Sequence, residues 1–169
     1  MNLALPLQST PELQAIVSQL WQQYQAGQRS FTRVAVQNGK IVVQVPNYAH
    51  ANLSNLKLRE INLPKANLSN LEAQRCDFSL ADLSETNLPK ANLSYSTLYR
   101  VRLHRSNLRG AKLVGAQLIQ TDLTGSDLSY ADLTGANLSG VVFDRVLFNH
   151  TIMPDGSYCH SPKDWKKAS

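Results

Sequence analysis

A five-residue pattern recurs from Ala51 to Met153 without an insertion or a deletion. Each unit reads small residue, Asn or Asp, Leu and two polar residues, as in Ala66-Asn67-Leu68. Twenty-one consecutive units follow one another, which excludes a chance periodicity. A fixed repeat predicts a solenoid in which each unit contacts its neighbours. It also indicates that function resides in the residues that depart from the repeat.

The period of five defines what each unit can form. It matches neither the 3.6 residues of a helical turn nor the alternation of a strand, so each unit combines a short extended piece with a turn. The first and third residues, such as Ala66 and Leu68, then point the same way and fill a narrow interior. Asn or Asp occupies the second position in 12 of the 21 units, where its side chain can bond nearby backbone amides.

The A-(N/D)-L-x-x units resemble those of the pentapeptide-repeat proteins over about three-fifths of the chain. This resemblance implies a mainly β fold, a right-handed quadrilateral β-helix with four units in each coil. The 21 units then form about five coils, stacked about 4.8 Å apart like neighbouring strands. Residues 20 apart are therefore expected to stack in columns. Proteins with this repeat are numerous in cyanobacteria and many have no assigned role, so the resemblance names no partner.

The first 50 residues differ from the repeat and predict an N-terminal cap. Ser9 or Thr10 can N-cap a helix over 11–26, which carries apolar residues at helical spacing. Asn38-Gly39 predicts a β-hairpin over 31–45. We expect both elements to cover the end of the coil stack, because an open end exposes unpaired backbone groups. A small independent binding module is the alternative.

The other end of the repeat is unusually apolar. Three residues replace Asn or Asp at the second position of their units: Val142, Leu147 and Ile152. With the β-helix placed over 51–155, a tail over 156–169 remains, and Tyr158 and Trp165 could fold back over the last coil. The alternative cover is a second copy of the protein, which gives a homodimer through the C-terminal end.

The charges favour a protein partner over nucleic acid. The net charge is +5, and the segment from Arg100 to Lys112 is basic, a composition that nucleic-acid-binding surfaces share. The 20-residue columns spread these cations around the rod, however, and set Arg102 beside Asp82 and Asp122. Another column runs Lys65, Glu85, Arg105, and such exposed pairs contribute little. We therefore expect nucleic acid not to be the partner.

Some pentapeptide-repeat proteins imitate DNA and inhibit topoisomerases with a strongly negative rod. The rod here carries 11 Lys and Arg against 9 Asp and Glu between residues 51 and 153. This balance disfavours a DNA mimic, which remains an alternative together with other nucleic-acid or topoisomerase effectors.

The sequence predicts no enzyme, no cofactor and no metal. Its histidines are scattered and no Cys-x-x-Cys or His-x-x-x-His spacing occurs, while the pair Cys159-His160 is too small for a metal site. The two cysteines, Cys76 and Cys159, suggest thiols in a reducing compartment, and we expect a cytoplasmic protein without a disulfide. No stretch is long and apolar enough for a membrane span, and no signal peptide is evident.

The remaining function is a non-catalytic scaffold or regulator that presents a rigid surface to a protein partner. The candidate contact residues are exposed departures from the repeat: Tyr95, Tyr99, Arg100, Arg109, Ile119 and Tyr130. The column rule sets Ile119 directly beside Tyr99, which predicts a small exposed apolar spot. A purely structural end-to-end homo-oligomer is the further alternative.

Overall fold

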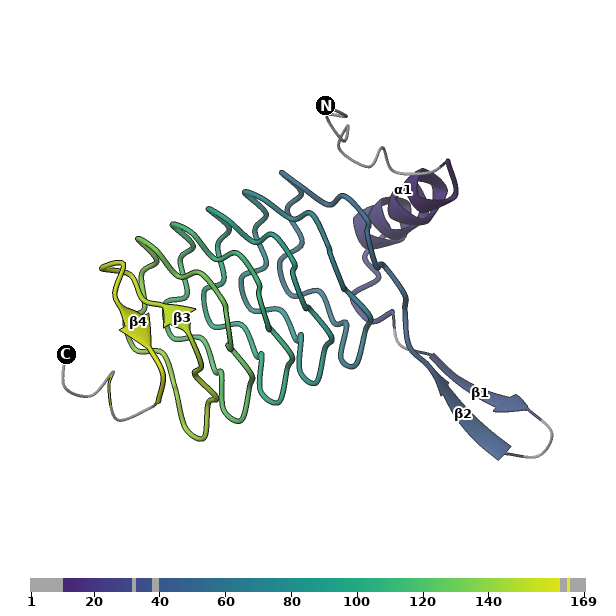
Figure 1. Ribbon diagram of the computed structural model, residues 1–169. Helices are drawn as coiled ribbons and strands as arrows, with labels where there is room; N and C mark the ends of the chain where they lie inside the picture. Colours follow the sequence, from purple (N-terminus) through teal and green to yellow (C-terminus); the bar gives the residue numbers. More distant parts are fainter. Residues whose placement is uncertain (1–10, 32, 38–39, 162–163, 165–169) are drawn as a thin grey trace, which may run out of the picture.

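The repeat region winds into a rod of stacked coils in the computed structural model, which describes residues 11–31, 33–37, 40–161 and 164 (Figure 1). Among these residues, no helix has the length and apolar character that a transmembrane span requires. The helix and strands, in chain order, are α1 (Pro11–Gln25), β1 (Arg33–Gln37), β2 (Lys40–Gln44), β3 (Thr151–Ile152) and β4 (Tyr158–Cys159).

Residues 20 apart in sequence lie side by side, as the column rule predicts. Parallel bridges join Asn52 to Glu72 near the start of the rod and Asp132 to Ile152 near its end. The bridges recur at every fifth residue, so one coil has four sides. Each side contributes a single bridging residue rather than a long strand. The expected mainly β character is therefore present as a ladder of short bridges, because a turn follows each extended piece.

The corners of the rod are turns, and many of them are stabilised by an Asn or Asp at the second position of the unit. The carboxylate of Asp82 accepts a hydrogen bond from the Ser84 amide (3.1 Å), and Asn52 binds the Ser54 amide in the same way (3.0 Å). The fifth residue adopts a positive φ in every unit from Asn55 to His150, for example 61° at Tyr95. Most of these residues are not glycine, so the rod contains many side chains in the left-handed region.

The interior is filled by the first and third residues of the units. The large third residues are buried except Leu138 and Phe143, which are half-buried, and Phe78 replaces Leu without exposure. Small first residues with a hydroxyl group donate to a carbonyl of the preceding coil. Ser106 thus bonds the Leu83 oxygen (2.8 Å), and Thr151 bonds the Leu128 oxygen (2.8 Å). These bonds satisfy polar groups that a dry core would otherwise leave unpaired.

The N-terminal end of the rod is in contact with α1. Leu20 lies in the same buried cluster as the coil leucines, and the Tyr24 hydroxyl donates to the Arg59 oxygen (3.1 Å). The chain then pairs Ser30 with Asn62 before it enters the hairpin.

The hairpin differs from the predicted cover. Its strands β1 and β2 pair in an antiparallel register, but Figure 1 shows the hairpin extending away from the coils. The chain leaves the stack after Phe31 and resumes coil pairing at Asn47, so the hairpin is an excursion beside the end of the rod. The predicted turn residues Asn38 and Gly39 lie outside the described residues.

The C-terminal end closes with a small hairpin, in which β3 pairs with β4 through a turn over 154–157. Cys159 is buried by this pairing, whereas Tyr158 is 62% exposed. The chain thus folds back onto the last coil through β4, but the Tyr158 side chain points outward, because β4 alternates one side chain inward and the next outward. Trp165 lies outside the described residues.

Candidate partner-binding surface

The six predicted contact residues fall on three different corners of the rod. Tyr95 lies on one corner, and Tyr99, Arg100 and Ile119 share the next corner along the chain. Arg109 and Tyr130 lie on a further corner. The structure therefore divides the predicted surface into three separate sites, because residues that are close in sequence turn onto different sides of each coil.

Tyr95 is 59% exposed and covers a glycine of the next coil. A Cβ atom added to Gly115 would lie only 2.7 Å from two carbons of the Tyr95 ring. The ring thus rests directly on the Gly115 backbone.

The second site joins Tyr99, Arg100 and Ile119. The Arg100 guanidinium lies over the Tyr99 ring, 5.1 Å from its centroid, and Arg100 Nε donates to Gln120 Oε1 (2.6 Å). The Arg100 amide donates to the Ile119 oxygen, so these residues lie on neighbouring coils at the same corner. Tyr99 and Ile119 are, however, half-buried rather than fully exposed.

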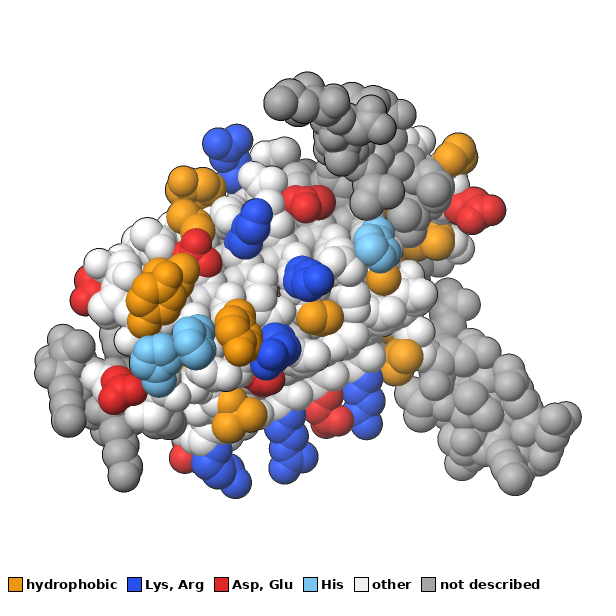
Figure 2. Space-filling model, viewed as in Figure 1, with side chains coloured by type: hydrophobic (Ala, Val, Ile, Leu, Met, Phe, Trp, Pro, Cys, Tyr) orange, Lys and Arg blue, Asp and Glu red, His pale blue; other side chains and the backbone are white. Residues whose placement is uncertain are grey.

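The third site is a run of ring contacts that we name the C-terminal ring cluster. The Arg109 guanidinium lies 4.6 Å from the Tyr130 centroid, and the Tyr130 ring stacks on His150 at 5.5 Å. His160 meets the His150 ring edge-on at 4.6 Å and stacks with Tyr158 at 6.4 Å. Figure 2 shows histidine, aromatic and basic side chains gathered near the C-terminal end of the rod.

The C-terminal ring cluster is open to solvent. Tyr130 and Tyr158 are 49% and 62% exposed, and the three other members are exposed as well. His150 Nδ1 lies 2.8 Å from Asn149 Oδ1. This contact orients the imidazole ring.

Three members of this cluster were missed by the sequence prediction. His150 stands 20 residues after Tyr130, so the column rule contained the signal for this contact. Tyr158 and His160 lie beyond the repeat, and only the β3–β4 hairpin brings them to this corner. The five-residue period does not predict that Tyr158 and His160 lie beside this corner.

The apolar residues of the last coil have different surroundings. Ile152 is half-buried and pairs with Tyr158 of β4, whereas Val142 and Leu147 are 47% and 59% exposed. The structure therefore covers one of the three predicted end residues and leaves two in contact with solvent.

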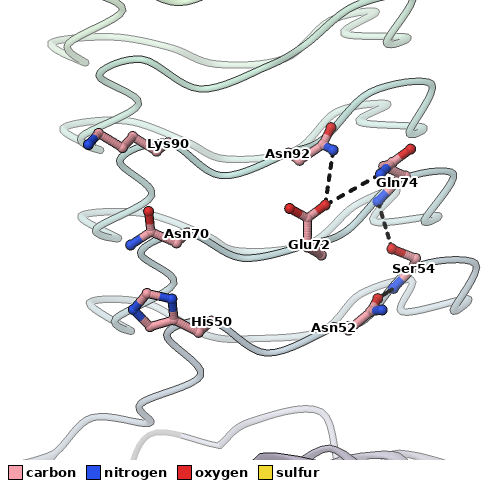
Figure 3. A pocket seen from close by; sticks show the side chains of 8 residues that line it. All are labelled: His50, Asn52, Ser54, Asn70, Glu72, Gln74, Lys90 and Asn92. Carbon is pink, nitrogen blue, oxygen red and sulfur yellow. Dashed lines mark hydrogen bonds between the residues drawn. The ribbon is translucent and has the colours of Figure 1, made fainter. Parts of the chain in front are cut away.

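A polar groove lies on the N-terminal half of the rod (Figure 3). It encloses about 630 Å³ and spans three coils. Figure 3 shows the side chains that line the groove arranged in three columns. We name the outer two columns the first and second rim and the middle column the floor. The lining residues are His50, Asn70 and Lys90 on the first rim, Asn52, Glu72 and Asn92 on the floor, and Ser54 and Gln74 on the second rim. His50 supplies the one ring side chain among these eight residues, and none of them is an aliphatic residue.

Two ion pairs on the rod join residues of the same column, as the sequence predicts. Arg102 Nη2 lies 3.0 Å from Asp82 Oδ2, and Lys65 lies 3.6 Å from Glu85. Burial would raise the pKa of Asp82, but hydrogen bonds from Ser84 and the charge of Arg102 lower it overall. Acidic and basic side chains alternate over the face in Figure 2, which is unlike the negative surface of a DNA mimic.

The described residues include no group of three or more His, Cys, Asp or Glu side chains that could hold a metal ion. Burial raises the pKa of the Cys76 thiol to about 11, although backbone hydrogen bonds at Leu56 and Asn55 lower it in part. A thiol with such a pKa is a poor nucleophile at neutral pH.

The repeats match the family model for pentapeptide repeats over residues 49–84, 76–113 and 102–140. The matched residues make up more than half of the chain, and the protein belongs to the pentapeptide-repeat family. Members of this family form right-handed β-helices, in agreement with the coils described above. No curated protein sequence matches the chain.

Among solved structures, the chain is similar to HetL, a pentapeptide-repeat protein involved in heterocyst differentiation regulation from the cyanobacterium Nostoc sp. strain PCC 7120. The TM-score is 0.65 and the sequences are 32% identical, with 67% of this chain and 53% of HetL covered. This chain thus spans about half the length of HetL.

Two other pentapeptide-repeat structures match less closely. The protein alr5209 of Nostoc PCC 7120 is 24% identical with a TM-score of 0.43, over 90% of this chain and 91% of that one. QnrB1, a plasmid-mediated fluoroquinolone resistance protein, is 16% identical with a TM-score of 0.49, over 63% and 64% of the two chains. Neither likeness carries a functional argument, because both TM-scores are below 0.5.

Proposed function

We propose that this protein is a non-catalytic scaffold or regulator that binds a protein partner through the C-terminal ring cluster. The observation that carries the proposal is the contiguous, exposed run of Arg109, Tyr130, His150, His160 and Tyr158. Tyrosine and arginine are enriched among the residues that dominate binding energy at protein interfaces.

The geometry of the cluster favours binding in a second way. Each ring is held by the next one, and the backbone beneath it is bonded to the neighbouring coil, as in the bond from the Tyr130 amide to the Asn149 oxygen (2.8 Å). Side chains that are ordered before binding lose little conformational entropy in a complex. Tyrosine adds a large contact area with few rotatable bonds.

The likeness to HetL supports the regulatory part of the proposal. HetL is described as involved in the regulation of heterocyst differentiation, and it shares the repeat rod with this chain. Only the class of a regulator is carried over, because about half of HetL has no counterpart here.

A co-purification experiment from lysate of the source organism tests the proposal. Tagged wild-type protein is expected to retain a specific protein after nuclease treatment. The double variant Arg109→Ser with Tyr130→Asn is expected to lose it, whereas Tyr95→Asn on another corner retains it. The fold should tolerate these substitutions, because each new residue type already occurs in its column. Ser69 lies in the column of Arg109, Asn70 in that of Tyr130 and Asn55 in that of Tyr95. Retention by the double variant, or release of all bound material by nuclease, would contradict the proposal.

We also infer that α1 acts as the N-terminal cap of the rod. Leu20 is buried in the common core, and Val17, Trp21 and Tyr24 pack against the same cluster. Replacing Leu20 with Asp should lower the unfolding free energy by about 3 kcal/mol, because it buries an unpaired charge. A loss below about 0.5 kcal/mol in denaturant titration would argue against the cap.

An end-to-end homodimer is a second candidate function, favoured by one observation at the C-terminal end. The Leu128 amide donates to the Leu147 oxygen of the next coil (2.9 Å), but within the described residues the equivalent Phe148 amide has no backbone acceptor. Leu147 is also 59% exposed. Light scattering tests this candidate. A dimeric mass for the wild type and a monomeric mass for Leu147→Asn would support the homodimer, and a monomeric mass for the wild type would exclude it.

A further inference from the structure

The polar groove carries two charges that remain without an ion pair. Elsewhere on the rod, Arg102 and Asp82 neutralise one another across neighbouring coils. Glu72 and Lys90 form no ion pair with any described residue, although they occupy adjacent coils of one groove. Figure 3 shows the Glu72 carboxylate on the floor and the Lys90 side chain along the first rim.

The floor holds Glu72 in one orientation. Asn92 Nδ2 donates to Glu72 Oε2 (2.9 Å), and Gln74 Nε2 donates to the same oxygen (3.3 Å). The Gln74 amide in turn donates to Ser54 Oγ (3.3 Å). Both donors to Glu72 are neutral, so its negative charge is positioned without being neutralised.

The other groove residues can bond a polypeptide backbone. The amide of Asn70 on the rim is able both to donate and to accept, as the backbone N–H and C=O of an extended segment require. Coils spaced about 4.8 Å apart make three coils about 10 Å long, which is enough for about three extended residues at about 3.3 Å each. The groove therefore matches the length of a short segment.

Other ligand classes fit this lining less well. Apart from the His50 imidazole, the lining offers no ring for a sugar to stack on, and an apolar ligand finds no aliphatic residue among the eight lining residues. Nucleic acid needs a positive groove, whereas the floor here carries the Glu72 carboxylate. A polypeptide with charges of both signs satisfies the groups that are present.

We propose that the groove binds an extended segment of a partner protein that places a basic side chain on Glu72 and an acidic one on Lys90. This inference rests on the proposed function, since it describes part of the partner. The first rim of the groove and the C-terminal ring cluster lie along the same corner of the rod, in the column His50, Asn70, Lys90, Gly110, Tyr130 and His150. The same partner can therefore contact both.

A peptide series tests the inference without knowledge of the partner. Seven-residue peptides in a Gly-Ser background carry one Lys and one Asp in either order and at several spacings, and matched controls carry Gln and Asn. Their binding is followed by NMR through the side-chain amide signals of Asn52, Gln74 and Asn92. One order of charges is expected to bind about tenfold more tightly than its neutral control.

A charge-swapped protein provides the sharper test. In the double variant Glu72→Lys with Lys90→Glu, the preferred order of Lys and Asp in the peptide should reverse. The variant should fold, because Lys112 already occupies the column of Glu72, and Glu85 adopts the left-handed φ that position 90 requires. Thermal unfolding checks this point.

Three results would overturn the inference: no peptide shifts the three amide signals, neutral peptides bind equally well, or the swap leaves the preference unchanged. Stronger shifts with a neutral oligosaccharide or an oligonucleotide would also overturn it. The two proposals can be tested separately. Tyr130→Asn changes the C-terminal ring cluster but leaves the groove intact, whereas the charge swap changes the groove but leaves the cluster intact.

Discussion

Tyr130 and His150 occupy equivalent corners of neighbouring coils, and their rings lie parallel with 2° between their planes. The Arg109 guanidinium lies over the Tyr130 ring as well. Tyr130 is thus held by a cation and an imidazole, while almost half of its surface remains exposed. Tyr130 is therefore the tyrosine of the cluster that contacts both a guanidinium and an imidazole.

Tyr130→Asn should lower the affinity for the partner about 30-fold, because an interface hot spot contributes about 2 kcal/mol. The free energy of unfolding should change little, since the side chain is exposed and Asn70 shows that the column accepts Asn. Calorimetric titration with the recovered partner measures the first quantity and urea titration the second. A fall in stability that explains the loss of binding would leave Tyr130 without a role at the interface.

Gly115 and Gly135 form a matched pair for a test of the Tyr95 contact. Both have a positive φ, of 64° and 66°, so an alanine at either position costs about 1 kcal/mol of strain. Only at Gly115 would the new Cβ also meet the Tyr95 ring. Gly115→Ala should therefore destabilise more than Gly135→Ala, by about another 1 kcal/mol.

The excess cost should vanish when Tyr95→Asn is present, since the ring is then absent. Thermal unfolding of the two single and the double variants measures this coupling. Equal destabilisation at the two glycines would show that the Tyr95 ring does not rest on the Gly115 backbone in solution.

Acid should weaken the rod through Asp82. Its pKa in the folded protein is lower than the ordinary value of 3.8, so its contribution to stability is present above that pH. The contribution is lost as the pH falls through the lowered pKa, because the unfolded chain binds the proton more tightly. Asp82→Asn keeps an oxygen for the Ser84 amide but removes the titration. The variant should show a shallower loss of stability below about pH 4, and an unchanged slope would contradict the role of Asp82.

The Cys76 thiol should be inert in the folded protein. It is buried, donates to the Leu53 oxygen and has a pKa of about 11. In a Cys159→Ser variant, where Cys76 is the single cysteine, a thiol reagent at pH 8 should label the protein only after unfolding. Labelling of the native protein at the rate of the unfolded chain would place Cys76 outside the core.

The sequence predicted the rod because its signal is repeated 21 times. The period fixed the 20-residue columns, and the pairs Arg102–Asp82 and Lys65–Glu85 followed from those columns alone. The predicted contact residues lie on three corners, because departures from the repeat show which residues are unusual but not which of them share a column. Applied to Tyr130, the same rule identifies His150 as its neighbour.

The ends of the rod were harder to predict. A hairpin signal at Asn38-Gly39 indicates a turn, but it carries no information about where the hairpin lies relative to the coils. The return of Tyr158 and His160 to the Tyr130 corner depends on the single β3–β4 hairpin, which has no repeat to reveal it. Such contacts arise from tertiary packing alone.

Site-specific photo-crosslinking tests the central claim most directly. A benzoylphenylalanine residue replaces either Tyr130 or Tyr95, two exposed corner tyrosines on different sides of the rod. After irradiation in nuclease-treated lysate, the Tyr130 derivative is expected to form a specific adduct with one partner protein, and the Tyr95 derivative is not. An adduct at Tyr95 alone, or adducts only between copies of this chain, would contradict a partner-binding role for the C-terminal ring cluster.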